Sequence, residues 1–299
     1  MQLPQPLRGI IPPVVTPLAG RDALDYSGLE RLLERIIAAG CHGIFVLGST
    51  GEAQALSYRL RLEMVSETCR LVGNRVPVLA GITDTALVES LEFGHACANA
   101  GISGLVAAAP YYFRMTQSDL LRHAESLATE LPLPIYLYNI PGLTKLSYDA
   151  ETVAEAAKIP GIAGLKDSSG DLIYLQRVLR LTSFRPDFSV LVGPEEVLGQ
   201  AMMLGAHGGV SGGANLRPEL YVKLWCAAEQ KRYDEVVSLG RRVMELSDAL
   251  YRVGDPSTSY FRGIKYALEA DGVCSGLPAA PLAPFTEPEK QIIRGWLAR

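Results

Sequence analysis

The chain has 299 residues, of which 48% are apolar and 20% are charged, with a formal net charge of −4. This composition is typical of a globular protein with a large core, and without a run of lysine or arginine it gives no electrostatic support for a nucleic-acid or membrane-surface partner. No segment approaches the roughly 18 continuous apolar residues of a membrane-spanning helix, and residues 1–9 lack the pattern of a secretory signal.

The cysteines and histidines give no sign of a metal site. The five cysteines form no Cys-x-x-Cys pair, which excludes the usual zinc-knuckle and thioredoxin motifs. The four histidines form no recognisable pair of metal ligands. An odd number of cysteines without a secretory signal predicts reduced thiols and a cytoplasmic protein.

A short apolar run, a turn of small residues and an amphipathic stretch follow one another along most of the chain. Eight apolar runs start roughly 20 to 34 residues apart, which is the size of one strand, one crossover helix and two loops. Pro12 and Pro13 make the first predicted strand the least regular, because proline cannot donate a ladder hydrogen bond. We predict strands at Gly9–Val15, Gly43–Leu47, Val76–Ala80, Gly104–Ala108, Pro134–Tyr138, Ile162–Lys166, Phe188–Val192 and Gly208–Ser211.

Helical patterns occupy the intervals between these runs. Apolar residues recur every three or four positions from Leu29 to Ile37, and Gly40 then ends the pattern. Similar patterns predict helices over residues 60–72, 118–129 and 172–181. After the eighth run, the last barrel helix and a small helical extension are predicted at residues 219–229, 233–251, 257–269 and 287–297.

Continuous apolar strands that alternate with helices indicate a parallel sheet buried on both faces, with right-handed crossovers. Eight such units favour a closed barrel over an open doubly wound sheet, and no Gly-x-Gly-x-x-Gly sequence for a dinucleotide follows any strand. We therefore predict an α/β fold, a (β/α)₈ TIM barrel over residues 1–225. Residues 226–299 form a C-terminal helical extension packed on the barrel in a single structural unit.

The catalytic groups of such a barrel gather at the C-terminal ends of its strands. Lys166 ends the sixth run, where it is either a solvated lysine or, among apolar side chains, an amine whose lowered pKa makes it a nucleophile. Asp167 should point outward by strand alternation. Tyr138 ends the fifth run, so it should neighbour Lys166, either as a core tyrosine or as a proton shuttle.

Other strand ends also carry polar or aromatic residues. Residues 48–52, Gly-Ser-Thr-Gly-Glu, form either an ordinary turn or a receptor for a carboxylate or phosphate made of backbone N–H groups. Tyr111 and Tyr112 follow the fourth run as a packing or subunit-contact cluster. Glu195 and Glu196 follow the seventh run and either begin a helix or accept hydrogen bonds from the hydroxyls of a polyol.

In this order, each at its own strand end, these residues resemble the dihydrodipicolinate synthase / N-acetylneuraminate lyase family of class I Schiff-base aldolases. The resemblance covers essentially the whole chain. It implies a lyase in which Lys166 forms a Schiff base with pyruvate and Tyr138, in the Tyr-Asn-Ile-Pro motif, relays protons. The iminium then serves as the electron sink while a carbon–carbon bond to an aldehyde forms or breaks, and no metal or other cofactor is required.

The resemblance also implies the residues that bind the substrate. Ser49 and Thr50, with Gly51 in the same loop, hold the carboxylate, and Thr50 continues the proton relay towards Tyr112. Family members lend that tyrosine across a subunit interface, which implies a homotetramer built as a dimer of dimers. The other substrate-binding positions expected are Leu143, Ser168, Glu195, Glu196, Val210 and Ser211.

One departure from the family pattern bears on the substrate. Synthases of the family carry an arginine two positions after the proline of the Tyr-Asn-x-Pro motif, where it grips the second carboxylate of aspartate semialdehyde, and this chain has Leu143 there. An isobutyl group cannot replace a bidentate anion clamp. We therefore expect reversible cleavage of a 2-keto-3-deoxy sugar acid, or a sialate-like substrate, to pyruvate and an aldehyde.

Other functions remain open from the sequence. The main alternative is a 4-hydroxy-tetrahydrodipicolinate (dihydrodipicolinate) synthase, which condenses pyruvate with aspartate semialdehyde. A dehydratase or a 4-hydroxy-2-oxoglutarate aldolase of the same family would share the lysine chemistry. A phosphate-binding barrel isomerase and a non-catalytic oxo-acid sensor are the outside alternatives, and neither explains why Lys166, Tyr138 and Thr50 occur together.

Overall fold

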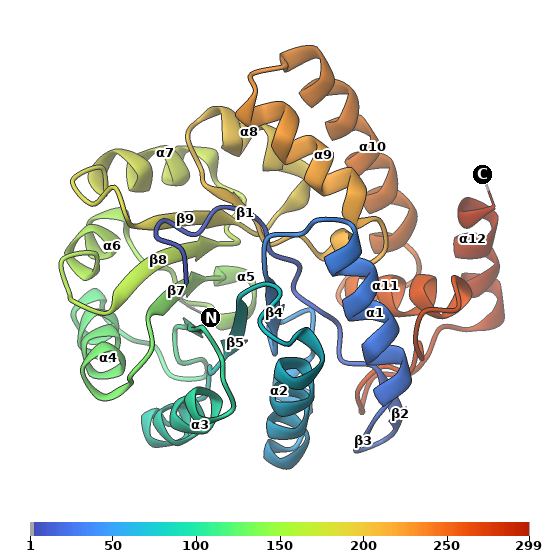
Figure 1. The fold of residues 1–299 in the computed structure, drawn as a ribbon, viewed down its shortest axis with the longest axis horizontal. Helices are drawn as coiled ribbons and strands as arrows, with labels where there is room; N and C mark the ends of the chain where they lie inside the picture. Colours follow the sequence, from blue (N-terminus) through green and yellow to red (C-terminus); the bar gives the residue numbers. More distant parts are fainter. Residues whose placement is uncertain (1–2, 299) are drawn as a thin grey trace.

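The structure, a computed structural model, describes residues 3–298. Within these residues eight parallel strands form one curved sheet in the order β1-β10-β9-β8-β7-β6-β5-β4 (Figure 1). Each strand falls within or overlaps one of the predicted runs, so the prediction of a TIM barrel is confirmed. The strands are β1 (Gly9–Ile10), β4 (Ile44–Val46), β5 (Val78–Gly81), β6 (Gly104–Ala108), β7 (Ile135–Asn139), β8 (Ile162–Asp167), β9 (Ser189–Val192) and β10 (Gly208–Gly209).

The barrel closes between the chain after β1 and strand β4. Pro13 and Phe45 form an isolated parallel bridge there. The backbone N–H of Phe45 donates to the carbonyl oxygen of Pro12 (3.0 Å), and its carbonyl accepts from the N–H of Val14 (2.8 Å). Because proline has no N–H, Pro12 and Pro13 can contribute only acceptors to this seam. The prolines therefore limit the regular part of the first strand but leave the barrel closed.

Helices follow the strands and surround the barrel (Figure 1). The helices predicted over 29–37, 60–72, 118–129 and 172–181 are present, whereas α3, the short helices α5, α6 and α8, and a small hairpin of β2 and β3 were not predicted. No helix within residues 3–298 is long and apolar enough to cross a bilayer. The elements are β2 (Leu18–Gly20), β3 (Ala23–Leu24), α1 (Tyr26–Ala38), α2 (Tyr58–Val72), α3 (Leu87–Asn99), α4 (Gln117–Glu130), α5 (Pro141–Thr144), α6 (Ala150–Ala156), α7 (Leu172–Leu181), α8 (Leu198–Met203) and α9 (Pro218–Glu229).

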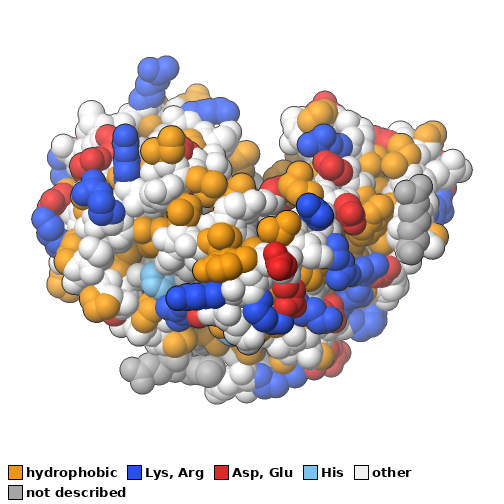
Figure 2. Space-filling model, turned by 90° about the horizontal axis from the view of Figure 1, so that it is seen from above, with side chains coloured by type: hydrophobic (Ala, Val, Ile, Leu, Met, Phe, Trp, Pro, Cys, Tyr) orange, Lys and Arg blue, Asp and Glu red, His pale blue; other side chains and the backbone are white. Residues whose placement is uncertain are grey.

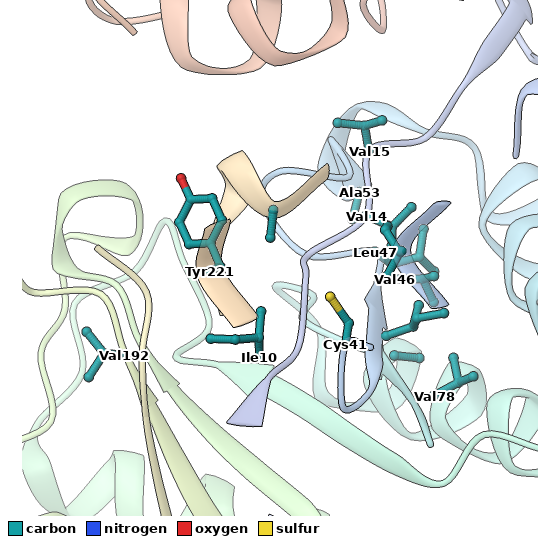
Figure 3. Packing of buried hydrophobic residues seen from close by; sticks show 14 of the residues in the cluster. Ile10, Val14, Val15, Cys41, Val46, Leu47, Ala53, Val78, Val192 and Tyr221 are labelled. Carbon is teal, nitrogen blue, oxygen red and sulfur yellow. The ribbon is translucent and has the colours of Figure 1, made fainter. Parts of the chain in front are cut away.

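Buried apolar side chains form an inner group inside the barrel and an outer group between the strands and the helices. Strand alternation sorts the side chains between them, because successive residues point to opposite faces. Ile10 belongs to the outer group, part of which Figure 3 shows, and Ile11 to the inner group. In β7, Leu137 points outward while Tyr136 and Tyr138 point inward. Alternation thus places Tyr138 inside the barrel.

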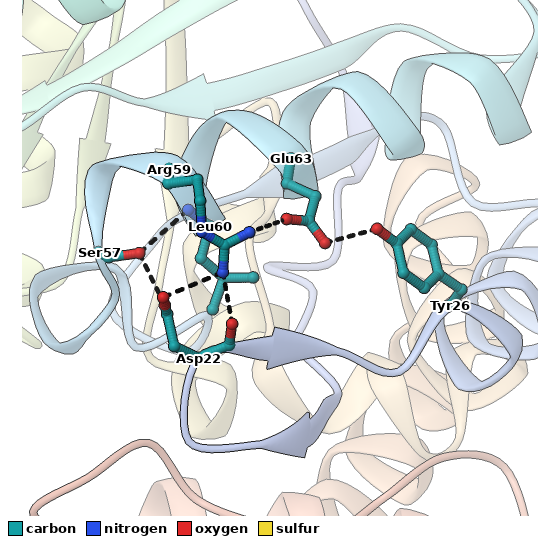
Figure 4. A network of polar contacts seen from close by, with 6 residues as sticks. All are labelled: Asp22, Tyr26, Ser57, Arg59, Leu60 and Glu63. Atoms are coloured by element: carbon teal, nitrogen blue, oxygen red, sulfur yellow. Dashed lines mark hydrogen bonds and ion pairs between the residues drawn. The ribbon is translucent and has the colours of Figure 1, made fainter.

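The β2–β3 hairpin anchors the first turns of α2 (Figure 4). Asp22 accepts hydrogen bonds from Ser57, which caps α2 (2.7 Å), and from Arg59 (3.0 Å). Tyr26 donates to Glu63 one turn further along (2.6 Å). These contacts hold the start of α2, which follows the loop at residues 48–52 after only a short 3₁₀ turn.

The predicted C-terminal helices are also present. Helix α10 packs on α9 and α11, and α11 contacts both α12 and η3, the short turn directly after β10. The extension therefore reaches the C-terminal end of the barrel strands. In the space-filling view a hollow separates the barrel from the C-terminal helices, and basic and acidic side chains are interspersed (Figure 2). These elements are α10 (Tyr233–Tyr251), α11 (Ser259–Ala270), α12 (Glu287–Leu297) and η3 (Gly212–Asn215).

The division predicted after residue 225 falls within α9, which is continuous from residue 218 to 229. We propose that α9 is the last barrel helix and that the extension starts with α10, still as part of one structural unit. The packing of α10 on α9 and of α11 on η3 supports this division.

The close approach of β1 and β10 generates a prediction about stability. A Cβ atom on Gly208 would lie 1.9 Å from the carbonyl oxygen of Gly9, a backbone atom that cannot move without changing the strand pairing. We expect Gly208→Ala to lower the free energy of unfolding by about 1–3 kcal/mol, the usual cost of overpacking.

The matched control is Gly240→Ala in α10, where nothing lies within 4 Å of the new methyl group. This change should be neutral or stabilising, because alanine favours a helix over glycine. Urea denaturation of both variants measures the difference, and equal transition midpoints would contradict the proposed crowding at the β1–β10 contact.

Candidate active site

Lys166 and Tyr138 lie side by side at the end of neighbouring strands. They are register partners in the parallel pairing of β7 with β8. The Nζ atom of Lys166 is 3.9 Å from the centre of the Tyr138 ring and 4.9 Å from the centre of the Phe45 ring. Lys166 is only 4% exposed and Tyr138 only 5%. The predicted neighbourhood of the two residues is confirmed, and the amine lies among aromatic rings away from solvent.

Burial controls the protonation of this pair. It lowers the pKa of Lys166 because desolvation penalises the ammonium form, and the phenol of Tyr138 opposes this effect. Burial alone would raise the pKa of Tyr138, but the charge of Lys166 and hydrogen bonds from Ser168 and Ser49 bring it below its usual value. The neutral amine is therefore available closer to neutral pH than that of a solvated lysine, as a nucleophile requires.

Asp167 points away from the lysine, as strand alternation predicts. Its carboxylate accepts hydrogen bonds from the amide of Asn139 (2.8 Å) and from the hydroxyl of Ser169 (2.9 Å). Asn139 and Asp167 are the register pair next to Tyr138 and Lys166, so this bond joins the same strand ends from the outer face. Burial raises the pKa of Asp167. The carboxylate thus secures β7 to β8 and does not serve as the counter-ion of Lys166.

The loop at residues 48–52 presents its hydroxyls to different tyrosines. The Oγ atom of Ser49 lies 3.5 Å from the hydroxyl of Tyr138, whereas Oγ1 of Thr50 lies 3.0 Å from the hydroxyl of Tyr260. Within this chain Ser49, and not Thr50, approaches Tyr138. Tyr112 is 86% exposed and Thr50 is buried, and the relay from Thr50 to a Tyr112 of another subunit stays a prediction.

Tyr260 was not predicted as a site residue. It lies in α11, 210 positions after Thr50 in sequence. The close packing of its hydroxyl explains Gly212 in the turn after β10, since a Cβ there would come within 2.0 Å of the Tyr260 oxygen. No local motif marks this tyrosine, because its proximity to the loop arises from the packing of the C-terminal extension.

The carboxylate of Glu195 is buried and contacts donors of the protein. Its Oε1 accepts hydrogen bonds from the hydroxyls of Tyr221 (2.5 Å) and Tyr251 (2.7 Å), and its Oε2 accepts from the backbone N–H of Gly213 (2.8 Å). Burial raises its pKa to about 7 although these donors stabilise the carboxylate. Donors of the protein therefore contact both carboxylate oxygens of Glu195, and its expected contact with substrate hydroxyls stays a prediction. The residue begins a short 3₁₀ helix, η2 (Glu195–Val197), and orders the turn after β10.

The contacts of the other residues expected to bind substrate say less about such a role. Glu196 accepts a hydrogen bond from Ser247 (2.5 Å) and is partly exposed. Ser168 contributes a hydrogen bond to Tyr138, and Val210 belongs to the inner apolar group that contains the same tyrosine. The hydroxyl of Ser211 is buried without a hydrogen-bond partner within residues 3–298. Their roles towards a substrate stay predictions.

A cavity of about 260 Å³ opens against Tyr138 and Phe45. Leu143 is 57% exposed and lies on its wall. All the lining residues are apolar or uncharged: Phe45, Leu47, Gly48, Ser49, Gln54, Gly81, Thr83, Val106, Ala108, Tyr111, Tyr138, Ile140, Leu143 and Thr144. The cavity therefore offers hydroxyl and amide groups but no cation. Among residues 3–298, no three His, Cys, Asp or Glu side chains form a group that could hold a metal ion.

Comparison with known proteins agrees with this geometry. The model of the dihydrodipicolinate synthetase family matches residues 6–298. The chain is 31% identical over 293 residues to the 4-hydroxy-tetrahydrodipicolinate synthase of Methanospirillum hungatei, which covers 97% of this chain and 98% of that protein. It is 31% identical over 292 residues to the synthase of Neisseria gonorrhoeae, covering 97% and 98%.

Solved structures give the same result over nearly the full length. Dihydrodipicolinate synthase from Bacteroides thetaiotaomicron matches with a TM-score of 0.96 and 47% identity over 99% of both chains. YagE, a prophage protein of the dihydrodipicolinic acid synthase family from E. coli K12 solved in complex with pyruvate, matches with a TM-score of 0.92 and 30% identity over 97% of both chains. The chain therefore belongs to the dihydrodipicolinate synthetase family.

Proposed function

We propose that this protein is a pyruvate-dependent lyase that acts through a Schiff base on Lys166. The observation that carries the proposal is the buried contact between the lysine amine and Tyr138. In the first step neutral Nζ attacks the keto carbon of pyruvate, and the resulting carbinolamine loses water to give an iminium. Tyr138 would supply the proton for the departing water and accept a proton later. The pyruvate bound to YagE supports the choice of 2-oxo acid.

The iminium makes the carbon–carbon step possible. It withdraws electrons from the adjacent carbon, so loss of a proton there, or cleavage of the bond to an aldehyde, yields an enamine. In the opposite direction the enamine carbon attacks the aldehyde carbonyl, and the new alkoxide takes up a proton. Ser49 and Thr50 would hold the pyruvate carboxylate through hydroxyl and backbone N–H donors. The N–H of Gly51 donates to the carbonyl oxygen of Gly48 (3.0 Å), so Gly51 would contribute by shaping the turn. No metal or separate cofactor enters these steps.

For the second substrate we propose the aldehyde of a 2-keto-3-deoxy sugar acid, with a sialate-like acid as a related possibility. The uncharged wall of the 260 Å³ cavity supports an uncharged, hydroxylated chain. This chain has Leu143 at the position where a synthase has the arginine that binds a second carboxylate. Burying an unpaired carboxylate in such a cavity would be costly, whereas hydroxyls can exchange hydrogen bonds with Gln54, Thr83 and Tyr111.

The second candidate is 4-hydroxy-tetrahydrodipicolinate synthase. The names of the two curated relatives described above, each 31% identical, and of the Bacteroides structure favour this function. Both candidates share the Lys166 chemistry and differ in the charge of the aldehyde. The residues that line the cavity, above all Leu143, would therefore determine which aldehyde the protein accepts.

We also propose a homotetramer in which Tyr112 completes the site of a second copy, in a cytoplasmic protein whose other partners are small molecules. Tyr112 and Phe113 are 86% and 74% exposed and contact each other edge to face. Tyr112 has a positive φ of 92°, which is strained for a tyrosine. Strain together with exposed aromatic rings supports the expectation that another subunit covers this turn.

Covalent trapping tests the central proposal. We expect incubation with pyruvate and borohydride to add the mass of a reduced pyruvyl-lysine to the intact protein, because the iminium is reduced to a stable amine. Intact-mass spectrometry measures the adduct, and Lys166→Ala should show none. A folded wild-type protein that binds pyruvate without an adduct would exclude Lys166 as the nucleophile.

Tyr138→Phe should change the pH dependence of trapping as well as its rate. The phenol raises the pKa of Lys166, so its removal should lower that pKa further and move the half-maximal trapping rate to lower pH. The maximal rate should fall by about 100-fold, since proton transfer is lost. Trapping rates with cyanoborohydride across a pH series measure both effects. A midpoint that stays unchanged or rises would contradict the assigned coupling.

Leu143→Arg should redirect the second substrate. A guanidinium on the cavity wall can bind a carboxylate, so we expect kcat/KM for aspartate semialdehyde to rise about tenfold while that for sugar-acid cleavage falls. Leu143→Met is the matched uncharged control. A panel of aldehydes and 2-keto-3-deoxy acids measures the preference. If the wild-type protein already prefers aspartate semialdehyde to every sugar acid, the synthase function is correct.

A further inference from the structure

Lys265, in α11, is a charged side chain sealed from solvent. Its exposed fraction is 0%, and Nζ forms an ion pair with Glu52 and donates to the carbonyl oxygen of Leu277 (2.9 Å). A buried ion pair carries a large desolvation cost, and apolar residues of similar volume often serve stability equally well. Stability alone therefore does not explain why this ion pair is present. Its position next to the candidate active site points to a role in that site.

Glu52 is the last residue of the loop at residues 48–52. Its backbone is left-handed, with φ 54° and ψ 30°, a conformation that a non-glycine residue keeps only where its surroundings hold it. Its Oε1 accepts from the backbone N–H of Ala279 (2.8 Å), while Oε2 faces the Lys265 ammonium. Its own N–H donates to the carbonyl oxygen of Ser49 (3.0 Å). A shift of Glu52 would therefore move Ser49 as well.

Helix α11 holds the same loop at a second point. Tyr260 contacts the hydroxyl of Thr50 (3.0 Å), five positions before Lys265 along the helix. Gly51 lies between the two contacts, and its carbonyl accepts from the hydroxyl of Thr16 (2.7 Å). The backbone N–H groups expected to receive a carboxylate are thus enclosed between contacts that the C-terminal extension makes.

We propose that Lys265 is a positioning residue for pyruvate binding, which acts through Glu52 to hold the loop of Ser49, Thr50 and Gly51 in the form that receives the carboxylate. This inference rests on the proposed Schiff-base reaction and gives the C-terminal extension a part in it. Lys265 is separated from the reacting atoms by Glu52 and the loop. Loosening the pair should therefore weaken binding of pyruvate while the chemistry of the bound molecule is preserved.

The variants must separate binding from folding. Lys265→Met alone leaves the Glu52 carboxylate buried without its counter-charge, which is strongly destabilising. Glu52→Gln alone likewise leaves the buried Lys265 ammonium without its counter-charge. The main variant is therefore the double variant Glu52→Gln with Lys265→Met, which removes both charges and keeps an acceptor for the Ala279 N–H. Arg31→Met is the matched control, since it breaks a bond from α1 to the Val273 carbonyl (2.8 Å) in the same C-terminal segment without involving the loop.

The measurement is borohydride trapping against pyruvate concentration, with thermal unfolding of each protein alongside. For the double variant we expect the half-saturating pyruvate concentration to rise about tenfold, with a maximal trapping rate within about twofold of wild type. Arg31→Met should lower the unfolding temperature and leave half-saturation unchanged.

Half-saturation within about twofold of wild type, in a double variant that unfolds cooperatively, would overturn the positioning role. A tenfold rise that Arg31→Met reproduces would also overturn it, because general loosening of the extension would then suffice. The wild-type protein is included in the same series. An adduct on the wild-type protein supports the Schiff-base reaction independently of the variants, and its absence would contradict that reaction and not the positioning role.

Discussion

A lysine amine is a nucleophile near neutral pH only where its ammonium form is disfavoured, and in this protein the inside of the barrel supplies that condition. Lys166 lies against the rings of Phe45 and Tyr138, which leave its charge poorly solvated. The register of β7 with β8 fixes this contact, and the Asn139–Asp167 bond secures the same strand ends on the outer face. The roles proposed for the hydroxyls near Tyr138, for the loop at residues 48–52 and for the cavity all depend on this one buried amine.

Much of the fold follows from the sequence because burial on both faces makes each barrel strand a continuous apolar run. The long amphipathic helices are equally visible, since a stripe such as Leu29 to Ile37 repeats over several turns. Helix α3 shows no such apolar stripe, because its buried face includes Ser90 and Gly94. The helices α5, α6 and α8 span too few turns to show a repeat. Lys166 and Tyr138 were predictable because strand order alone makes them neighbours.

The rest of the site depends on contacts between distant segments, which no local pattern records. Glu195 reads as a substrate ligand in sequence, yet Tyr221 and Tyr251 from the C-terminal third of the chain occupy its carboxylate. Contacts between distant segments also determine which tyrosine each loop hydroxyl approaches. Thr50 contacts Tyr260 from α11, whereas Ser49 lies near Tyr138. The extension thus does more than cover the barrel. It supplies the side chains that set the polar groups around the catalytic end.

The seam at Pro12 and Pro13 has a consequence for the nascent molecule. Until the first and second barrel strands meet, the sheet has two open edges, and an open edge with free N–H groups can recruit strands from other molecules. At the first edge, two successive residues offer no donor at all, so a foreign strand finds few hydrogen bonds there. Phe45 still forms both of its bonds there, because its N–H donates to the Pro12 carbonyl oxygen and its carbonyl accepts from the Val14 N–H. A foreign strand could form few hydrogen bonds beyond these, so the two prolines make the first edge a poor template for intermolecular pairing.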